Sequence, residues 1–129
     1  MKLETKFWHK VKKNTPKIDW VRIESWASFG VPDLLGYHDS CGFFMCELKI
    51  QRGNKIIFSP HQMLFHMTRK FRNFILVEFH DNQQNAPAPR SIKLYESSEI
   101  QKLQSNISDA KIAAIDDWTA IQNKLLGIN

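Results

Sequence analysis

The chain has 129 residues, of which 43% are hydrophobic and 24% are charged, as in ordinary soluble globular proteins. This length suits one domain spanning residues 1–129, and it suffices to bury a core without disulfide or metal cross-links. No apolar stretch is long enough to span a bilayer, and residues 1–6 are not followed by the apolar segment of a signal peptide. We therefore expect no membrane association and a cytoplasmic location.

Lysine and arginine number 18 against 13 acidic residues, which gives a net charge of +5 and a pI near 9.3. A basic excess favours polyanionic partners, because neutralised phosphates release their counterions. The lysines concentrate in residues 2–17, and a second basic cluster occupies residues 69–72. Solvated helix faces are the ordinary alternative for both clusters.

The cysteines and histidines do not predict a zinc site. Cys41 and Cys46 fit no zinc spacing, and we expect two reduced thiols. His61 and His66 are five residues apart, so they do not share a helical face as an i, i+4 pair would.

Apolar periodicity and turn residues predict the elements in chain order. A short amphipathic helix is expected over residues 4–13, ended by Asn14-Thr15-Pro16, and residues 28–30 form a turn or bulge. Strands are expected at 18–26, 31–37 and 43–50, with a hairpin loop at 38–42 and a polar turn at 51–54. Ser59 and Pro60 begin a helix that runs to about Phe71, with an apolar stripe formed by Met63, Leu64, Met67 and Phe71.

The second half continues with strands at 74–79 and 92–95, separated by a loop at 81–90, and with helical segments at 98–104 and 116–126. The order is then α-β-β-β-α-β-β-α, a mixed α/β fold.

Two carboxylates flank the predicted hairpin loop at 38–42. Asp33 stands at the start of one predicted strand and Glu47 on the next, so the antiparallel hairpin brings both into one cleft. Carboxylate oxygens that converge in this way are suited to a divalent metal ion.

Glu47 and Lys49 are two residues apart on a strand, so both project from one face while Leu48 points to the other. Opposite charges in an otherwise apolar strand indicate function, since burying such a pair often costs more in desolvation than it returns. A partly exposed Glu–Lys pair on an amphipathic strand is the structural alternative.

These residues resemble the motif of the PD-(D/E)XK nuclease superfamily, especially small VRR-NUC and Holliday-junction-resolvase-like members. The pattern appears as Gly30-Val31-Pro32-Asp33, then Glu47-Leu48-Lys49, then Gln62 on the following helix. In residue types the similarity covers about residues 4–62. In the order of helices and strands it covers nearly the whole chain. It implies a restriction-endonuclease-like mixed sheet flanked by helices.

The resemblance implies a metal-dependent endonuclease that hydrolyses DNA. Asp33 and Glu47 would bind Mg²⁺ or Mn²⁺, with the Leu48 carbonyl as a further ligand. Lys49 would orient the attacking water, and Gln62 would hydrogen-bond near the phosphate or the nucleophile. Relatives often carry another acidic ligand on the first helix, which favours Glu4 here over Glu24.

The expected partner is DNA, including branched forms such as Holliday junctions and flaps, in the repair or recombination of a bacterial or phage-infected cell. Its expected contacts are Lys6, Lys10, Lys13, His61 and Arg69. Trp8, Trp20 and Trp26 either stack on unpaired bases or pack in the core. A homodimer would suit paired cuts, with the stripe Ile112, Ile115, Trp118, Ile121 and Leu125 packing across a two-fold axis or over the protein's own sheet.

Two other interpretations come from different functional classes. A module of the same fold can bind nucleic acid without catalysis, and a small basic protein can bind a protein partner. Neither explains why Asp33, Glu47 and Lys49 occur together.

Overall fold

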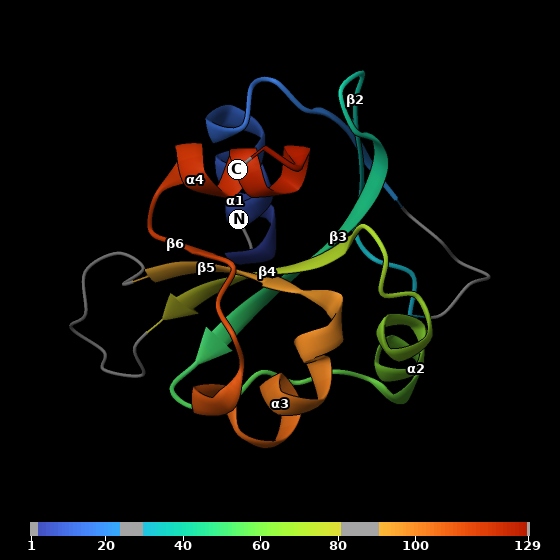
Figure 1. Ribbon diagram of the computed structural model, residues 1–129. Helices are drawn as coiled ribbons and strands as arrows, with labels where there is room; N and C mark the ends of the chain where they lie inside the picture. The colour runs from blue at the N-terminus through green and yellow to red at the C-terminus, as the bar shows by residue number, and fades with distance from the viewer. Residues whose placement is uncertain (1–2, 24–29, 81–90, 129) are drawn as a thin grey trace.

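The computed structural model describes residues 3–23, 30–80 and 91–128, and it shows a sheet covered by helices on both faces (Figure 1). The helices are α1 (Leu3–Asn14), α2 (Pro60–Thr68), α3 (Ile100–Ser105) and α4 (Trp118–Leu126). The strands are β1 (Asp19–Arg22), β2 (Leu34–His38), β3 (Gly42–Arg52), β4 (Asn73–His80), β5 (Ser91–Glu96) and β6 (Ala114–Ile115).

The six strands lie in the sheet in chain order, from β1 to β6. Only β3 and β4 are parallel, and α2 provides the crossover between them; the other neighbours are antiparallel. The predicted α/β class with a mixed sheet flanked by helices is confirmed, and the arrangement is consistent with a restriction-endonuclease-like fold. None of the helices in the described part of the chain is long and apolar enough to cross a membrane.

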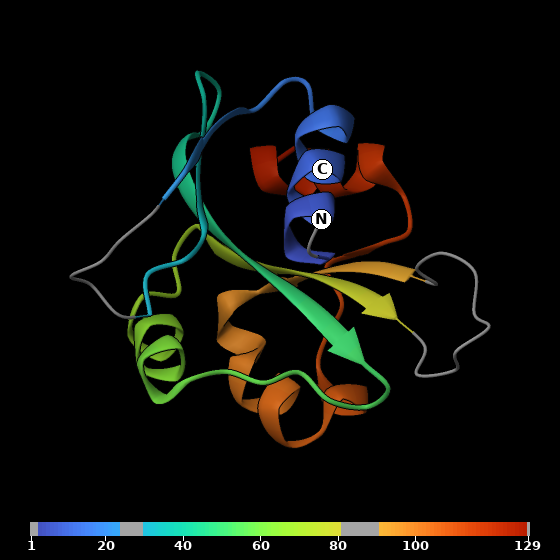
Figure 2. The ribbon, with the colours of Figure 1, turned by 180° about the vertical axis from the view of Figure 1, so that it is seen from behind.

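The core is divided between the two faces of the sheet, with α1 and α4 on one face and α3 on the other (Figures 1 and 2). On one face, Phe44, Cys46 and Leu48 of β3 pack in a cluster with residues of α1 and α4. On the other face, Ile75 and Val77 of β4 pack with residues of α3 and of the segment before α2. The odd-numbered residues of β3, including Glu47 and Lys49, therefore face the side of α2 and α3.

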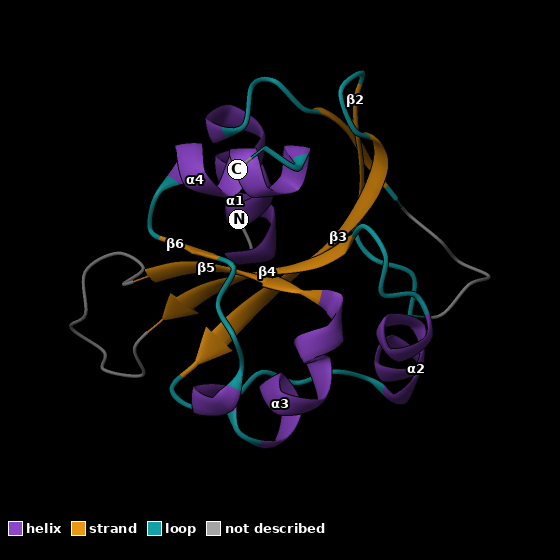
Figure 3. Ribbon diagram, in the orientation of Figure 1, coloured by secondary structure: helices purple, strands orange, loops and turns teal. Residues whose placement is uncertain are grey.

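β3 is longer than its neighbour β2, and this difference creates an open edge. β2 pairs with β3 only between Gly42 and Cys46, whereas β4 pairs with β3 as far as Arg52. From Glu47 onward, β3 has no strand partner on the β2 side within the described residues. Figure 3 shows β3 continuing beyond this point toward the loop that leads to α2.

Several predicted boundaries were wrong. The second predicted strand begins at Leu34 rather than Val31, because Gly30 has a positive φ of 82° and Pro32 has no N–H for the ladder. β3 includes Gln51 and Arg52, which were predicted as part of a turn. The first predicted strand is observed over Asp19–Arg22, and residues 24–26 of that prediction lie outside the described residues, as does the loop at 81–90.

The later helices also differ from expectation. α2 ends at Thr68, whose hydroxyl bonds back to the Leu64 carbonyl, and Arg72 then turns the chain with a φ of 52°. Phe71 therefore lies outside α2, where it is 91% exposed, and only Met63 of the predicted stripe packs against a core cluster. α4 begins at Trp118 because the Asp117 side chain accepts hydrogen bonds from two N–H groups of its first turn. The two-residue strand β6 was not predicted.

Candidate active site

A cavity of about 640 Å³ lies beside the open edge of β3. Its walls come from α1, β1, β2, β3, the loop after β3 and α2. The lining residues are Glu4, Trp8, Arg22, Asp33, Leu34, Glu47, Leu48, Lys49, Ile50, Arg52, Lys55, Ile57 and Gln62. The cavity thus brings together Glu4, Asp33, Glu47, Leu48, Lys49 and Gln62, all of the predicted catalytic and metal-binding residues.

Asp33 lies one residue before β2, at the point where the pairing of β2 with β3 ends. Its Oδ2 accepts a hydrogen bond of 2.9 Å from the Leu48 N–H, and its backbone carbonyl accepts one of 2.7 Å from the Ile23 N–H. In an extended strand the N–H and C=O of one residue point to the same side. The Leu48 carbonyl therefore also faces the open edge, where it can serve as a further oxygen ligand.

Gly30 explains the first position of the Gly-x-Pro-Asp segment. A Cβ at this position would lie 2.3 Å from the His61 carbonyl oxygen, and the φ of 82° is itself unfavourable for other residues. The backbone before Asp33 consequently passes directly against the first turn of α2, which carries Gln62.

Glu47 lies at the bottom of the cavity with an exposed fraction of 2%. Its Oε1 accepts a hydrogen bond of 3.1 Å from Gln62 Nε2, and its Oε2 is buried without a hydrogen-bond partner in the described structure. Burial, reinforced by the nearby charge of Asp33, raises the pKa of the Glu47 carboxyl well above its usual range. The carboxyl group therefore needs a proton or a cation to be stable there.

Lys49 is held by two carbonyl oxygens beside Glu47. Its Nζ donates to the Ile57 carbonyl at 2.6 Å and to Gln62 Oε1 at 2.9 Å, and it lies 4.9 Å from the centre of the Phe58 ring. Burial lowers the pKa of Lys49, while the neighbouring carboxylates oppose this shift. One of the three ammonium N–H groups remains for another acceptor.

Gln62 links the acid and the base. Its side-chain oxygen accepts from Lys49 and from the Ser59 N–H, and its nitrogen donates to Glu47. The Ser59 hydroxyl accepts in return from the Gln62 N–H, so Gln62 also completes a capping box at the start of α2. Gln62 thus has two structural roles: it caps the start of α2, and it orients the two charged groups.

The donor set fits a magnesium-like ion. Asp33 and Glu47 supply hard oxygen ligands, and an ion would replace the proton that the buried Glu47 otherwise requires. Within the described residues no group of three or more His, Cys, Asp and Glu side chains is placed to hold a metal. Two carboxylates and a carbonyl are nevertheless sufficient for Mg²⁺, which commonly keeps several waters or substrate oxygens as its remaining ligands.

Glu4 lines the cavity from the first turn of α1, where it is exposed, and its charge acts on Lys49. Its rival Glu24 lies outside the described residues. The structure therefore places Glu4 at the cavity.

The residues predicted to contact nucleic acid lie elsewhere. Lys6, Lys10, Lys13, His61 and Arg69 are absent from the cavity wall. Lys6 and Lys13 are exposed on α1, and the Arg69 guanidinium stacks 4.5 Å from the centre of the Phe65 ring.

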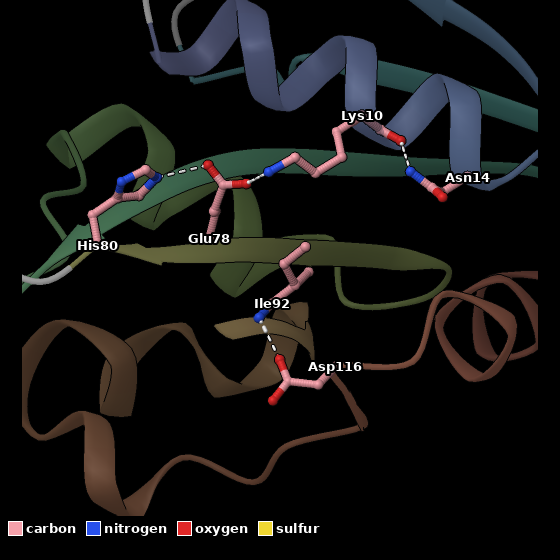
Figure 4. A network of polar contacts seen from close by, with 6 residues as sticks. All are labelled: Lys10, Asn14, Glu78, His80, Ile92 and Asp116. Carbon is pink, nitrogen blue, oxygen red and sulfur yellow. Dashed lines mark hydrogen bonds and ion pairs between the residues drawn. The ribbon is translucent and has the colours of Figure 1, made fainter. Parts of the chain in front are cut away.

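Lys10 is engaged by the sheet below α1. Its Nζ lies 2.6 Å from Glu78 Oε2, and Glu78 Oε1 lies 2.7 Å from His80 Nε2 (Figure 4). The Glu78 side chain is 3% exposed, so Lys10 is required to compensate a buried carboxylate. This contact joins α1 to the sheet across a sequence separation of 68 residues.

Replacing Lys10 with methionine should destabilise the protein by about 1–3 kcal/mol, because Glu78 would lose its closest compensating charge. Solvent screening limits the loss, because the Lys10 side chain is 34% exposed. Urea unfolding would measure the effect, with Lys13→Met as the exposed control on the same helix. The double variant Lys10→Met/Glu78→Met should recover most of the loss, and equal midpoints for Lys10→Met and Lys13→Met would contradict this role.

Three of the four cationic residues that line the cavity were not predicted as site residues. They are Arg22 of β1, Arg52 at the end of β3 and Lys55 in the following turn. Their signal in the sequence was weak, since Arg52 was predicted to lie in the polar turn at 51–54 and Lys55 directly follows it. Only the extension of β3 beyond β2 places them along one edge.

Among the described residues, Trp8 and Trp20 pack against neighbouring rings, while Trp8 also lines the cavity, so base stacking by Trp8 stays a prediction. Trp8 lies edge-on to Trp20, and Trp20 edge-on to Phe44, while Trp26 lies outside the described residues. Ile121 and Leu125 are fully buried against the protein's own sheet, so this part of the proposed dimer stripe covers the core. Ile112 and Ile115 are partly exposed and lie before α4. Cys41 and Cys46 are both free thiols, as predicted.

His66 gives the protein a pH dependence that is separate from the carboxylates. It is fully buried on α2, and its Nδ1 lies 2.6 Å from the Ser97 hydroxyl oxygen. Burial, together with the charge of Lys49, lowers the pKa of His66 to about 4. The unfolded chain binds this proton at a higher pH than the folded chain, so stability is present above about pH 6.5 and decreases as the pH falls toward 4.

Protonation of His66 is expected to lower the free energy of unfolding by on the order of 2–3 kcal/mol between pH 6.5 and pH 4. Urea unfolding of the wild type and of His66→Gln across this range would measure it. The difference in unfolding free energy between the two proteins should shrink or reverse as the pH falls. A difference that stays constant with pH would contradict the assignment.

No protein-family model matches the chain, and no curated protein is similar enough to count as a relative.

Proposed function

We propose that this protein is a metal-dependent nuclease of the PD-(D/E)XK type that hydrolyses phosphodiester bonds of DNA. The observation that carries the proposal is the arrangement of Asp33, Glu47 and Lys49 at one cavity, joined through Gln62 and the Leu48 backbone. The structural alternative was a partly exposed Glu–Lys pair on an amphipathic strand. It is weaker, because Glu47 and Lys49 form no ion pair among those found in the described residues. The two charged groups instead meet through an amide that keeps both oriented toward the cavity.

Each residue has a defined role in this proposal. Asp33, Glu47 and the Leu48 carbonyl would hold Mg²⁺ or Mn²⁺, which supplies Lewis acidity and a hydroxide-like water near neutral pH. Lys49 donates its remaining N–H to the attacking water or to the phosphoryl oxygen that gains charge. Gln62 keeps Glu47 and Lys49 in position, and from the cavity wall it can also hydrogen-bond near the phosphate or the nucleophile.

Labelled DNA substrates incubated with Mg²⁺, Mn²⁺ or EDTA test the proposal. The set should include a single strand, a duplex, a nicked duplex, a flap and a four-way junction, with a matching RNA strand. Cleavage that requires the metal supports a nuclease. Binding without cleavage of any substrate would favour the non-catalytic module and overturn the proposal.

A preference for branched DNA and action as a homodimer are finer parts of the proposal. Light scattering beside the same panel tests them together. A dimer that makes paired cuts near a branch point would support a resolvase. A monomer that cuts linear strands as fast as junctions would overturn the resolvase but not the nuclease.

Replacing Glu4 with glutamine should lower the cleavage rate by about tenfold, and excess Mn²⁺ should restore part of it, because Glu4 supplies negative charge at the cavity wall. Initial rates over a metal titration would show this as a higher metal requirement. An unchanged metal requirement in Glu4→Gln, with a raised one in Glu24→Gln, would assign the role to Glu24 instead.

A further inference from the structure

Three cationic side chains along the cavity form no polar contact with the described part of the chain. Arg22, Arg52 and Lys55 are exposed, and their side chains have no hydrogen-bond or ion-pair partner in the described part of the chain. All three nevertheless line the same cavity as the carboxylates. Their charged groups are therefore available to a ligand in the cavity.

The charge of the cavity matches a short polyanion. Of the described side chains, four cationic ones and three carboxylates line it, so one bound divalent cation would leave an excess of three positive charges. Each nucleotide contributes one phosphate charge, and the excess corresponds to a segment of about three nucleotides.

The length of the edge is also sufficient for such a segment. Glu47 and Arg52 are five residues apart on β3, a span of about 17 Å at the usual rise of a strand. Arg22 is paired with Leu34 and so stands beside Asp33 at the opposite end of this edge. A strand of nucleic acid lying along β3 would meet a cation before, at and after the carboxylates.

The walls of the cavity favour an unpaired strand. Glu47 is 2% exposed and lines the cavity together with apolar side chains. Trp8 and Ile57 provide apolar wall, and Ile57 is 77% exposed. Unpaired bases have free faces that bind apolar and aromatic side chains, whereas the faces of paired bases are covered by stacking.

We infer that Arg22, Arg52 and Lys55 form a subsite for the phosphates of an unpaired nucleic-acid strand that lies along the open edge of β3. This inference rests on the proposed nuclease function, whose substrate class it narrows to single strands and single-stranded ends or flaps. It also reassigns the main electrostatic contacts from the lysines of α1 to the cavity.

Binding in EDTA tests the subsite without any cleavage. A labelled oligothymidylate of about ten nucleotides and a blunt duplex of equal length would be titrated by fluorescence anisotropy at several salt concentrations. The cavity variant is Arg22→Gln/Arg52→Gln/Lys55→Gln. The matched control Lys6→Gln/Lys13→Gln/Lys17→Gln removes the same charge from exposed positions outside the cavity.

The wild type should bind the single strand more tightly than the duplex. The cavity variant should lose at least about tenfold in affinity for the single strand, and its salt dependence should weaken by about two in the slope of log K against log salt. The control variant should lose less on both measures. Equal losses in the two variants, or equal binding of duplex and single strand by the wild type, would overturn the inference.

The outcomes separate the subsite from the nuclease. Metal-dependent cleavage with indistinguishable triple variants would remove the subsite and leave the nuclease. Single-strand binding that depends on the cavity cations, in a protein that cleaves nothing, would retain the subsite and remove the nuclease.

Discussion

Replacing Glu47 with glutamine is expected to abolish DNA cleavage, with a loss on the order of a thousandfold or more, while leaving the protein folded. The amide keeps the size of the side chain and can still accept the hydrogen bond that Gln62 Nε2 donates to Oε1. It removes the charge that would hold the metal ion. The unfolding midpoint should change little, because burial already disfavours a charge at this position and the neutral amide carries none.

Single-turnover cleavage and DNA binding measured on the same preparations would separate the two effects. Binding should be retained or become tighter, since a negative charge near phosphate is removed. Glu96→Gln is the matched control, because Glu96 is an exposed carboxylate on β5 outside this cavity. Cleavage that persists in a clean Glu47→Gln preparation would refute the assignment of Glu47.

Replacing Lys49 with methionine is expected to lower kcat by about 10²–10³-fold, because one positioned donor to the developing charge is lost. Methionine keeps an unbranched apolar stem beside the Phe58 ring but makes no bond to the Ile57 carbonyl or to Gln62. KM should change much less than kcat if Lys49 acts mainly in the transition state. Lys49→Arg should not restore activity, since the planar guanidinium does not fit a site that holds a compact ammonium.

Lys93→Met is the matched control for this variant. Lys93 is a partly exposed lysine on β5 of the same sheet, outside the cavity, and should be replaceable without loss of rate. Circular dichroism would establish that both variants are folded. A Lys49→Met protein that is folded and cleaves at more than a tenth of the wild-type rate would exclude Lys49 from the chemistry.

The arrangement of Asp33, Glu47 and Lys49 was predictable because it depends on local rules. The turn residues at 38–42 define an antiparallel hairpin, and the register Leu34↔Cys46 brings the next pair, Asp33 and Glu47, to its end. The two-residue period of a strand then places Lys49 on the face of Glu47. Ser59 and Pro60 likewise marked the start of α2, and with it the position of Gln62.

The residues that surround this centre were not predictable, because they depend on long-range relations. Arg52 and Lys55 line the cavity only because β3 extends past β2, and the sequence does not show where strand pairing stops. Lys10 was predicted to contact DNA, but its partner Glu78 is 68 residues away. The sequence shows that a helix carries charged residues, but it does not show which of them pair with a buried opposite charge on the sheet.

The end of α2 was missed for a different reason. No glycine or proline follows Thr68, so the apolar pattern seemed to continue to Phe71. The helix stops through side-chain bonds, including one from the Asn73 amide to the Arg69 carbonyl. Arg72 then adopts a left-handed backbone, which patterns of residue type rarely reveal.

The central claim is that Asp33 and Glu47 together hold one divalent cation, and a Mn²⁺ titration tests it most directly. Free Mn²⁺ would be followed by electron paramagnetic resonance at high concentrations of wild type, Asp33→Asn, Glu47→Gln and the control Glu96→Gln. We predict one weak site in the wild type and in Glu96→Gln, and the loss of that site in both Asp33→Asn and Glu47→Gln. Equal Mn²⁺ binding by all four proteins would contradict the account.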